Sequence, residues 1–465
     1  MTTAVVWYRR DLRVHDLPAL AGAAREHDRV LPLFVFDPVL LGGRFRSAGR
    51  TAWMLDALHA LDEELRARGG RLAVRSGAPE EVLPEVVREV GADAVHCSEE
   101  TTGFARARDD RVDEALGDVP LVRHPGIYIA DLNRVLTKDG RPYTVFSPFL
   151  RSWTRQERRS VVPAPRAIEL PSGAKIGRMP SLASLGFDGA PDLLDRPPAS
   201  EAAAQKAAKR WVRSEIRGYG TGRNVLADDT SRLSVHLRFG TLSPLWLEER
   251  VRAAGGRGAE VYRSELAWRD FYGAVLLHHP EAARMEFQER YRGTLAWDDD
   301  PDALAAWKAG ETGYPVVDAA MRQLRVMGWM HNRARMIVAS FLVKDLHLDW
   351  RLGEAHFMEH LLDGDVGSNN GGWQWVASTG TDPAPYFQRL FNPTRQQERF
   401  DPDGRYVRRW IPELSDVPDA KLGEPWTMSD DEQRQADCAI GKDYPAPIVD
   451  HAAERRVAME RYRAA

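Results

Sequence analysis

The sequence predicts two domains, an α/β domain at the start of the chain and a larger domain built of helices alone. In the first part of the chain, short apolar, β-rich segments alternate with helical patterns. Seven prolines fall within residues 160–200, which is typical of an irregular connecting segment. From about residue 201 onward the apolar residues keep a helical spacing, and 465 residues is long for one core.

The α/β domain is predicted over residues 1–130. Five segments are typical of buried strands: residues 4–8, 30–36, 71–76, 93–98 and 120–124. Helical patterns lie between them, as at residues 51–68 and 80–90. This order predicts a parallel, five-stranded, Rossmann-like sheet with helices on both faces. The turn after the first strand reads RRDLRVHD, and without a GxGxxG pattern the glycine-rich dinucleotide motif is excluded there.

Residues 131–200 are predicted to connect the domains, and residues 201–465 to form the all-α domain. No run of eighteen apolar residues predicts a membrane span, and the start MTTAVVWYRR lacks the order of a signal peptide. Cys97 and Cys438 are the only cysteines. Two distant cysteines favour a reducing cytosol and argue against disulfides, zinc or an iron–sulfur cluster, so no metal is expected.

The charge distribution is less neutral than the total suggests. A net charge of −4 argues against a nucleic-acid partner. Residues 321–345, however, hold five basic side chains against the single acid Asp345. Such segments could form a basic face that binds phosphates, or they could be ordinary solvated helix surfaces.

Residues 363–375, DGDVGSNNGGWQW, are the most unusual segment. Carboxylates, carboxamides, a glycine pair and two indoles together predict a pocket for a large, planar, partly polar ligand. The alternative is an Asx-rich surface turn that leads into a helix. Seven tryptophans lie between residues 268 and 375, and they could fill the core, stack on rings or carry electrons. They are Trp268, Trp297, Trp307, Trp329, Trp350, Trp373 and Trp375.

Three further segments combine polar and aromatic residues. In TSRLS (230–234), Thr230 is predicted to cap a helix whose first turn could bind phosphate, or simply to cap it. In ELAWRDFY (265–272), Glu265, Trp268 and Arg269 share one helix face, either as a cavity wall or as a surface ion pair beside a core indole. In GWMHNRARM (328–336), Asn332, Arg335 and Met336 also share one helix face, and Met336 suits contact with a ring edge. The alternative is an ordinary helix with an amphipathic basic face.

These segments, together with WYRRDLR near the start, make the chain similar to the photolyase/cryptochrome family over its whole length. It most resembles the bacterial class I cyclobutane pyrimidine dimer photolyases. The resemblance implies FAD in the helical domain, with Arg335 paired to Asp363 and Asn369 facing flavin N5. The implied FAD-binding residues are Tyr219, Thr230, Ser231, Arg232, Leu233, Ser234, Tyr262, Arg269, Asn332, Arg335, Asp363, Gly364, Asp365 and Asn369.

The resemblance also implies a reaction. Blue light excites FADH⁻, an electron passes to a flipped-out pyrimidine dimer in UV-damaged DNA, the cyclobutane ring splits and the electron returns. The implied catalytic residues are Glu265, Trp268, Asn332, Met336, Asn369 and Trp375. The implied DNA contacts are Glu265, Trp268, Arg269, Tyr272, Asn332, Arg333, Trp375 and Gln396. The implied electron-transfer chain is Trp297, Trp350 and Trp373.

Alternatives within the family are a cryptochrome-like photosensor without repair activity and a (6-4) photoproduct repair enzyme. Folate-binding relatives carry an Asn–Glu pair where this chain has Phe104 and Ala105. The expected antenna is therefore 8-hydroxy-5-deazaflavin, with 5,10-methenyltetrahydrofolate or no antenna as alternatives. The implied antenna residues are Phe34, Asp37, Arg50 and Glu100. A monomer in the bacterial cytosol is expected.

Overall fold

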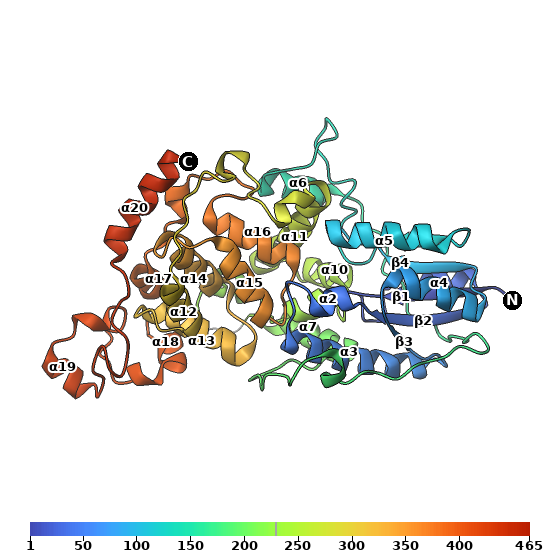
Figure 1. Cartoon of the computed structure of the whole chain (residues 1–465), viewed down its shortest axis with the longest axis horizontal. Helices are drawn as coiled ribbons and strands as arrows, with labels where there is room; N and C mark the ends of the chain where they lie inside the picture. The colour runs from blue at the N-terminus through green and yellow to red at the C-terminus, as the bar shows by residue number, and fades with distance from the viewer. Residues whose placement is uncertain (228–229) are drawn as a thin grey trace.

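The computed structural model describes residues 1–227 and 230–465. Five parallel strands form one sheet in the order β3-β2-β1-β4-β5. Their bounds are β1 (Thr3–Tyr8), β2 (Arg29–Phe36), β3 (Ala73–Ser76), β4 (Ala94–Ser98) and β5 (Leu121–His124). All five predicted strands are confirmed, and the domain lies at one end of the molecule in Figure 1.

Helices cover both faces of the sheet. They are α1 (Pro18–Glu26), α2 (Pro38–Gly42), α3 (Ala48–Arg66), α4 (Pro79–Val90) and α5 (Gly103–Leu116). Successive strand residues point to opposite faces, so β1 contributes Val6 to the core under α1 and α3, and Val5 to the core under α4 and α5. Near-continuous apolar strands are what a sheet buried on both faces requires.

The predicted connector, residues 131–200, is not wholly irregular. It contains α6 (Phe146–Arg155) and a short 3-10 helix, η1 (Ala183–Leu185). Helix α6 packs against the long helix α11 (Gly256–His278), where Trp153 Nε1 donates to Asp270 Oδ2 at 2.9 Å. The proline-rich part, residues 160–200, contains only η1 and follows the prediction.

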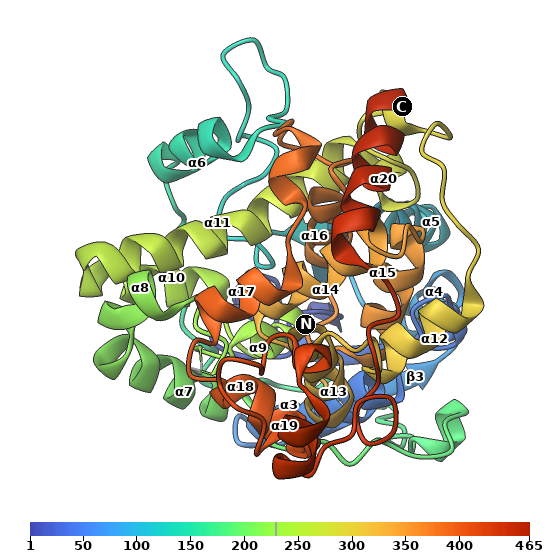
Figure 2. The same ribbon diagram turned by 90° about the vertical axis from the view of Figure 1, so that its left-hand side faces the viewer.

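The rest of the described chain is helical, as predicted. The α-helices are α7 (Glu201–Ser214), α8 (Tyr219–Gly222), α9 (Ser234–Phe239), α10 (Pro244–Ala254), α11, α12 (Pro301–Ala309), α13 (Pro315–Met327), α14 (Asn332–Lys344), α15 (Trp350–His360), α16 (Val366–Ala377), α17 (Pro393–Phe400), α18 (Arg405–Trp410), α19 (Asp430–Gln435) and α20 (His451–Ala464). The 3-10 helices are η2 (Ile216–Gly218), η3 (Pro280–Ala283), η4 (Glu289–Tyr291), η5 (Tyr386–Arg389), η6 (Pro412–Leu414) and η7 (Pro425–Thr427). Helix α16 packs against α11, α14 and α15, which Figure 2 shows around the interior of the domain. Among the described residues, none of these helices combines the length and apolar character needed to cross a membrane.

The RRDLRVHD turn joins the two domains. Arg10 forms an ion pair with Asp365 at the start of α16, and Arg13 Nη1 donates to the Gly240 carbonyl at 2.9 Å. The carboxylate of Glu201, at the start of α7, accepts from the backbone N–H of Val14 at 2.8 Å. A turn without glycine therefore serves as a docking surface, because its arginines and amides reach groups on three helices of the second domain.

Candidate active site

The unusual segment 363–375 forms a buried turn followed by α16. Asp365 is the N-cap, since its Oδ1 accepts from Ser368 N at 2.9 Å. The segment therefore does form an Asx-capped turn that leads into a helix, as the alternative interpretation predicted. This turn is buried, however, and does not lie at the surface. Asp363, Asn369 and Asn370 are only 8%, 9% and 3% exposed. Polar side chains this deep require partners.

Arg335 and Asp363 form the ion pair that the resemblance implied. Arg335 Nη2 lies 2.9 Å from Asp363 Oδ2, and Arg335 Nε donates to the Met330 carbonyl at 2.9 Å. The second carboxylate oxygen, Oδ1, is buried and has no hydrogen-bond partner within the described protein. Asn369 Nδ2 donates to the Glu354 carbonyl at 3.1 Å, which holds the amide in place. Both side chains are therefore fixed with an acceptor oxygen available.

Asp365, predicted to contact FAD, is largely engaged within the protein. Burial alone would raise its pKa, but Arg10, Arg269 and Arg238 hold the pKa of this carboxyl well below its usual range. Gly364 leaves room for an arginine of the first domain, because a Cβ at this position would lie only 2.7 Å from Arg50 Nη1. Asp365 and Gly364 therefore contact Arg10 and Arg50 of the first domain, which links the site to that domain.

The TSRLS segment lies against a tyrosine pair. Ser231 Oγ and Tyr262 Oη are 2.8 Å apart, and the rings of Tyr219 and Tyr262 meet edge to face at 5.1 Å. The prediction that Thr230 caps the following helix is wrong. Helix α9 begins at Ser234, and its N-cap Leu233 makes no side-chain cap. The cause is local, because Arg232 takes a left-handed φ of 49° that interrupts the helical path after Thr230.

One face of α11 carries the predicted lesion-binding residues. Trp268 stacks on Phe146 with ring centroids 3.6 Å apart, and Tyr272 lies 5.4 Å from Trp268. Glu265 forms an ion pair with Arg223. Desolvation raises the pKa of Glu265, and the charge of Arg223 offsets only part of this rise. The shared face predicted from the i, i+3, i+4 spacing is confirmed as part of one continuous helix.

Arg269, on the same face, is held by main-chain carbonyls. Its Nη1 and Nη2 donate to Ile127 O at 2.7 Å and to Leu237 O at 3.2 Å. It therefore ties α11 to the end of the first domain and to α9. Nothing in the spacing of ELAWRDFY could show this, because both acceptors are distant in sequence.

Arginines gather beside α14. Arg333 Nη2 donates to Asn224 Oδ1 at 2.9 Å. Burial lowers the pKa of Arg333, and the nearby charges of Arg223 and Arg399 lower it further. Three guanidinium groups that repel one another favour an anionic partner such as phosphate. This cluster supports the basic-face interpretation over ordinary solvated helix surfaces.

The remaining predicted contacts surround this region. Asn332 is exposed at the start of α14, and its Nδ2 lies 4.0 Å from Met336 Sδ. The Arg389 guanidinium lies over the Trp375 ring, 4.0 Å from the ring centroid. Trp375 Nε1 donates to Asp382 Oδ2 at 3.4 Å. Gln396, on α17, has a buried Oε1 without a hydrogen-bond partner among the described residues.

The glycine pair does two different things. A Cβ at Gly371 would lie 2.1 Å from the Tyr272 ring, whereas a Cβ at Gly372 would meet no protein atom within 4 Å. Gly371 therefore lets α16 pack on α11, and only Gly372 faces open space, as a close approach to a cofactor would need. Gly353, which the sequence analysis missed, makes the same kind of room for Trp373, whose ring would lie 2.0 Å from its Cβ.

The three predicted electron-transfer tryptophans differ in burial. Trp373 and Trp350 are 2% and 0% exposed, and Trp297 is half-buried. Trp373 Nε1 has no hydrogen-bond partner in the described protein, while Trp350 Nε1 donates to Glu286 at 3.3 Å. Trp307 was not predicted to belong to the electron-transfer chain, yet its ring centroid lies 6.1 Å from that of Trp373. Trp373 and Trp350 are thus buried, and only Trp297 of the three is partly accessible.

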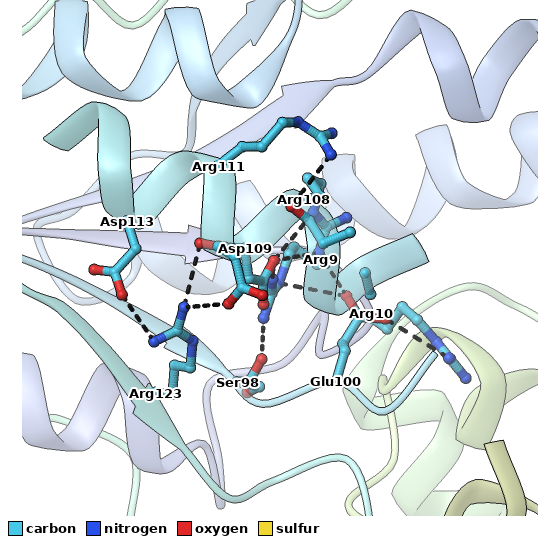
Figure 3. A network of polar contacts seen from close by, with 12 residues as sticks. Arg9, Arg10, Ser98, Glu100, Arg108, Asp109, Arg111, Asp113 and Arg123 are labelled. Atoms are coloured by element: carbon cyan, nitrogen blue, oxygen red, sulfur yellow. Dashed lines mark hydrogen bonds and ion pairs between the residues drawn. The ribbon is translucent and has the colours of Figure 1, made fainter. Parts of the chain in front are cut away.

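The predicted antenna residues lie near the carboxyl edge of the sheet. Figure 3 shows Glu100 within a network of arginines, where Arg9, Arg10 and Arg108 approach it to 3.5, 3.8 and 3.1 Å. Burial alone would raise the pKa of Glu100, but these cations lower it to about 2.

The other antenna residues have structural partners. Arg50 donates to the carbonyls of Met358 and Leu361, and Asp37 caps α2. Phe34 is 6% exposed and packs edge to face on Phe36. A cavity of about 460 Å³ adjoins this segment and is lined by residues that include Phe36, Pro38 and Ser76.

The site's chemistry fits FAD. Asp363 Oδ1 is a buried acceptor without a partner, suited to an N–H of the ring system. Hydroxyls of Ser231, Ser234 and Tyr219 suit the ribityl and phosphate oxygens. Gly372 leaves one side of α16 open.

Comparisons with known proteins agree with this geometry. Residues 4–169 match the family model described as DNA photolyase, and residues 262–464 match the FAD binding domain of DNA photolyase. The deoxyribodipyrimidine photo-lyase of Streptomyces griseus is 42% identical, with 100% of this chain and 99% of that protein aligned.

Two solved structures have nearly the same fold. A class III photolyase from Agrobacterium tumefaciens has a TM-score of 0.93 and 34% identity, covering 100% of this chain and 98% of that one. A cryptochrome from Synechocystis has a TM-score of 0.92 and 27% identity, covering 99% of both chains. The α/β domain, the helical FAD-binding domain and the full-length similarity establish that the chain belongs to the DNA photolyase family.

Proposed function

We propose that this protein is a deoxyribodipyrimidine photo-lyase, a carbon–carbon lyase that repairs cyclobutane pyrimidine dimers in UV-damaged DNA with light. The observation that carries this proposal is the full-length similarity to the photo-lyase of Streptomyces griseus. The cryptochrome from Synechocystis shares the fold at lower identity. Repair is therefore favoured over photosensing alone.

FAD would be held by the residues around the Arg335–Asp363 pair. Asp363 Oδ1 would accept a hydrogen bond from the ring system, and the Asn369 amide would face N5. Tyr219, Tyr262 and the TSRLS residues would bind the phosphates and the ribityl chain. When bound in its reduced form and excited by light, the flavin supplies the electron that opens the cyclobutane ring.

The protein's own residues would bind and orient the lesion. A dimer must leave the duplex stack, and aromatic walls repay part of that cost. Trp268 is fixed by stacking on Phe146, and Trp375 is fixed by Arg389. Glu265, held by its ion pair with Arg223, would offer a hydrogen bond to a base edge. Arg223, Arg333 and Arg399 would bind phosphates.

The repair assay tests this proposal directly. UV-irradiated oligo-dT is mixed with the chemically reduced protein, and blue light should restore thymine absorbance while a dark sample stays unchanged. Trp268→Ala should weaken binding of the irradiated strand about 5- to 100-fold, because one stacking surface is worth about 1–3 kcal/mol. Phe104→Ala, which removes an exposed ring of the first domain, is the control.

A photosensor would give a different result. It would bind FAD and respond to light but leave the dimers intact when fully reduced. Unchanged thymine absorbance with reduced FAD present would therefore contradict the repair proposal.

We infer that 8-hydroxy-5-deazaflavin is the antenna, bound near Phe34, Asp37, Arg50 and Glu100. Phe104 is 41% exposed and Ala105 has no polar side chain, so the folate-type contacts are missing. The structure of an archaeal photolyase from Sulfolobus tokodaii contains two FAD molecules, which implies a novel light-harvesting cofactor in that protein.

The antenna proposal predicts a host-dependent spectrum. Protein purified from a host that makes deazaflavin should carry an additional violet–blue absorption band, which Glu100→Gln should diminish. A protein from the same host that carries a folate chromophore, or only FAD, would contradict the proposal.

Three further statements remain predictions from the sequence. They are the domain bounds of 1–130, 131–200 and 201–465, a monomeric state, and a location with the DNA of a bacterial cytosol.

A further inference from the structure

Three histidines from separate parts of the first domain meet beside β4. His27 follows α1, His96 lies in the middle of β4, and His124 ends β5. His96 Nδ1 lies 2.9 Å from His124 Nε2, and His96 Nε2 lies 3.4 Å from His27 Nε2. None of them belongs to the proposed FAD, lesion or antenna residues. The cluster needs its own explanation.

The distances fit a metal centre better than a hydrogen bond. At 3.4 Å, the two Nε2 atoms are farther apart than a good N–H···N contact. Two ligands of a tetrahedral zinc ion with Zn–N bonds of about 2.0–2.1 Å would lie about 3.4 Å apart. A carboxylate oxygen of Glu26, at the end of α1, completes a group in which all ligand atoms lie within 4.8 Å of one another.

His124 acts as a partner to the central ligand. A metal-bound histidine usually donates its other ring N–H to an acceptor, which fixes the tautomer. Here His96 Nδ1 can donate to His124 Nε2, which leaves His96 Nε2 free to bind a metal. A Cβ at Gly22 would lie 2.8 Å from His124 Cε1, so glycine on α1 makes room for this ring.

The protonation state also suits a metal. Burial, together with the neighbouring His124 and His27, lowers the pKa of His96 to about 4. Burial lowers the pKa of His124 as well. The neutral imidazole is the form that binds a metal, so both shifts are in the direction that favours binding.

The outer side of the cluster is open. Glu26 is exposed and pairs with Arg25 at 2.5 Å, a surface interaction that a cation could replace at little cost. His96, in contrast, is fully buried. The group therefore has one buried ligand on a strand, one half-buried ligand at the end of a helix and one exposed carboxylate.

We propose that Glu26, His27 and His96 bind a divalent transition metal of the zinc class, with His124 positioning His96, and that this metal joins α1 to β4. The absence of a metal was expected from the cysteine count alone. Imidazole and carboxylate ligands do not depend on cysteine.

The test is zinc binding by the full-length flavoprotein after treatment with EDTA. Competition with a chromophoric chelator should show one tight equivalent of Zn²⁺. His27→Gln and His96→Gln should weaken it at least about tenfold, and His124→Gln by about 10- to 100-fold. Glu26→Gln should also weaken it, and this exposed position poses no risk to folding. X-ray absorption at the zinc edge should report nitrogen and oxygen ligands only.

His59→Gln, an exposed histidine on α3, is the matched control and should leave the affinity unchanged. A second group, His356, Glu359 and His360 on α15, provides the competing explanation. Zinc affinity that falls in His360→Gln but not in Glu26→Gln or His27→Gln would overturn the proposal. Wild-type affinity equal to that of Glu26→Gln and His27→Gln would overturn it as well. FAD content and thermal unfolding without zinc report whether each variant folds.

Discussion

Trp373→Phe is expected to abolish photoreduction of the oxidised flavin while leaving dimer repair intact once the flavin has been reduced chemically. Trp373 is almost fully buried, and its Nε1 has no hydrogen-bond partner within the described protein. Phenylalanine is far harder to oxidise than an indole, so the inner step of the proposed chain to Trp350 and Trp297 would be lost. The bleaching of flavin absorbance under blue light measures the first effect, and thymine recovery measures the second.

Trp307→Phe is the matched control for this experiment. Trp307 is also fully buried, lies 6.1 Å from the Trp373 ring, and donates from Nε1 to Val338 O at 3.0 Å. Both variants should lose about 1–2 kcal/mol of unfolding free energy from imperfect packing. Only Trp373→Phe should lose photoreduction. Equal rates in wild type and Trp373→Phe would remove Trp373 from the electron path, and a loss in Trp307→Phe would add Trp307 to it.

Asp363→Asn is expected to weaken FAD binding about 10- to 100-fold, since a hydrogen bond to a charged group is worth about 1.5–3 kcal/mol. The side chain of Asp363 is 4% exposed and its partner Arg335 is 24% exposed. Loss of the carboxylate would leave a half-buried cation unpaired and lower the unfolding free energy by about 2–3 kcal/mol. FAD release on dilution and denaturant unfolding measure these two effects.

Asp419→Asn separates a site effect from a general loss of charge. Asp419 is 80% exposed and pairs with Arg408. Its loss should cost less than about 1 kcal/mol and leave FAD content unchanged. Asp363→Asn protein that retains FAD as tightly as Asp419→Asn protein would contradict the proposed role of Asp363.

Much of the fold followed from local sequence patterns. The five strands were predicted because parallel strands buried on both faces are continuously apolar. The shared faces of Glu265 with Trp268, and of Asn332 with Met336, follow from helical periodicity alone. Thr230 shows the limit of such reasoning, since its capping role failed where Arg232 takes a left-handed conformation.

Contacts between distant segments could not be predicted in this way. Gly371 was expected to serve the cofactor, and it instead accommodates Tyr272 of another helix. The partner of Asp365 is Arg10, more than 350 residues earlier in the chain, and the predicted contact of Asp365 with FAD stays a prediction. No periodicity encodes these partners, because domain docking decides which side chains meet.

The sequence by itself determined the two-domain class, the family resemblance and the residue types of the site, because motifs and periodicity are local properties of the chain. The tertiary structure decided what each residue contacts. Asp363 and Asn369 are buried only because α16 packs among α11, α14 and α15. His27, His96 and His124 converge only because the sheet order places β4 and β5 beside α1. Burial and proximity set the charge state and available partners of a side chain, and both arise from packing between segments far apart in sequence.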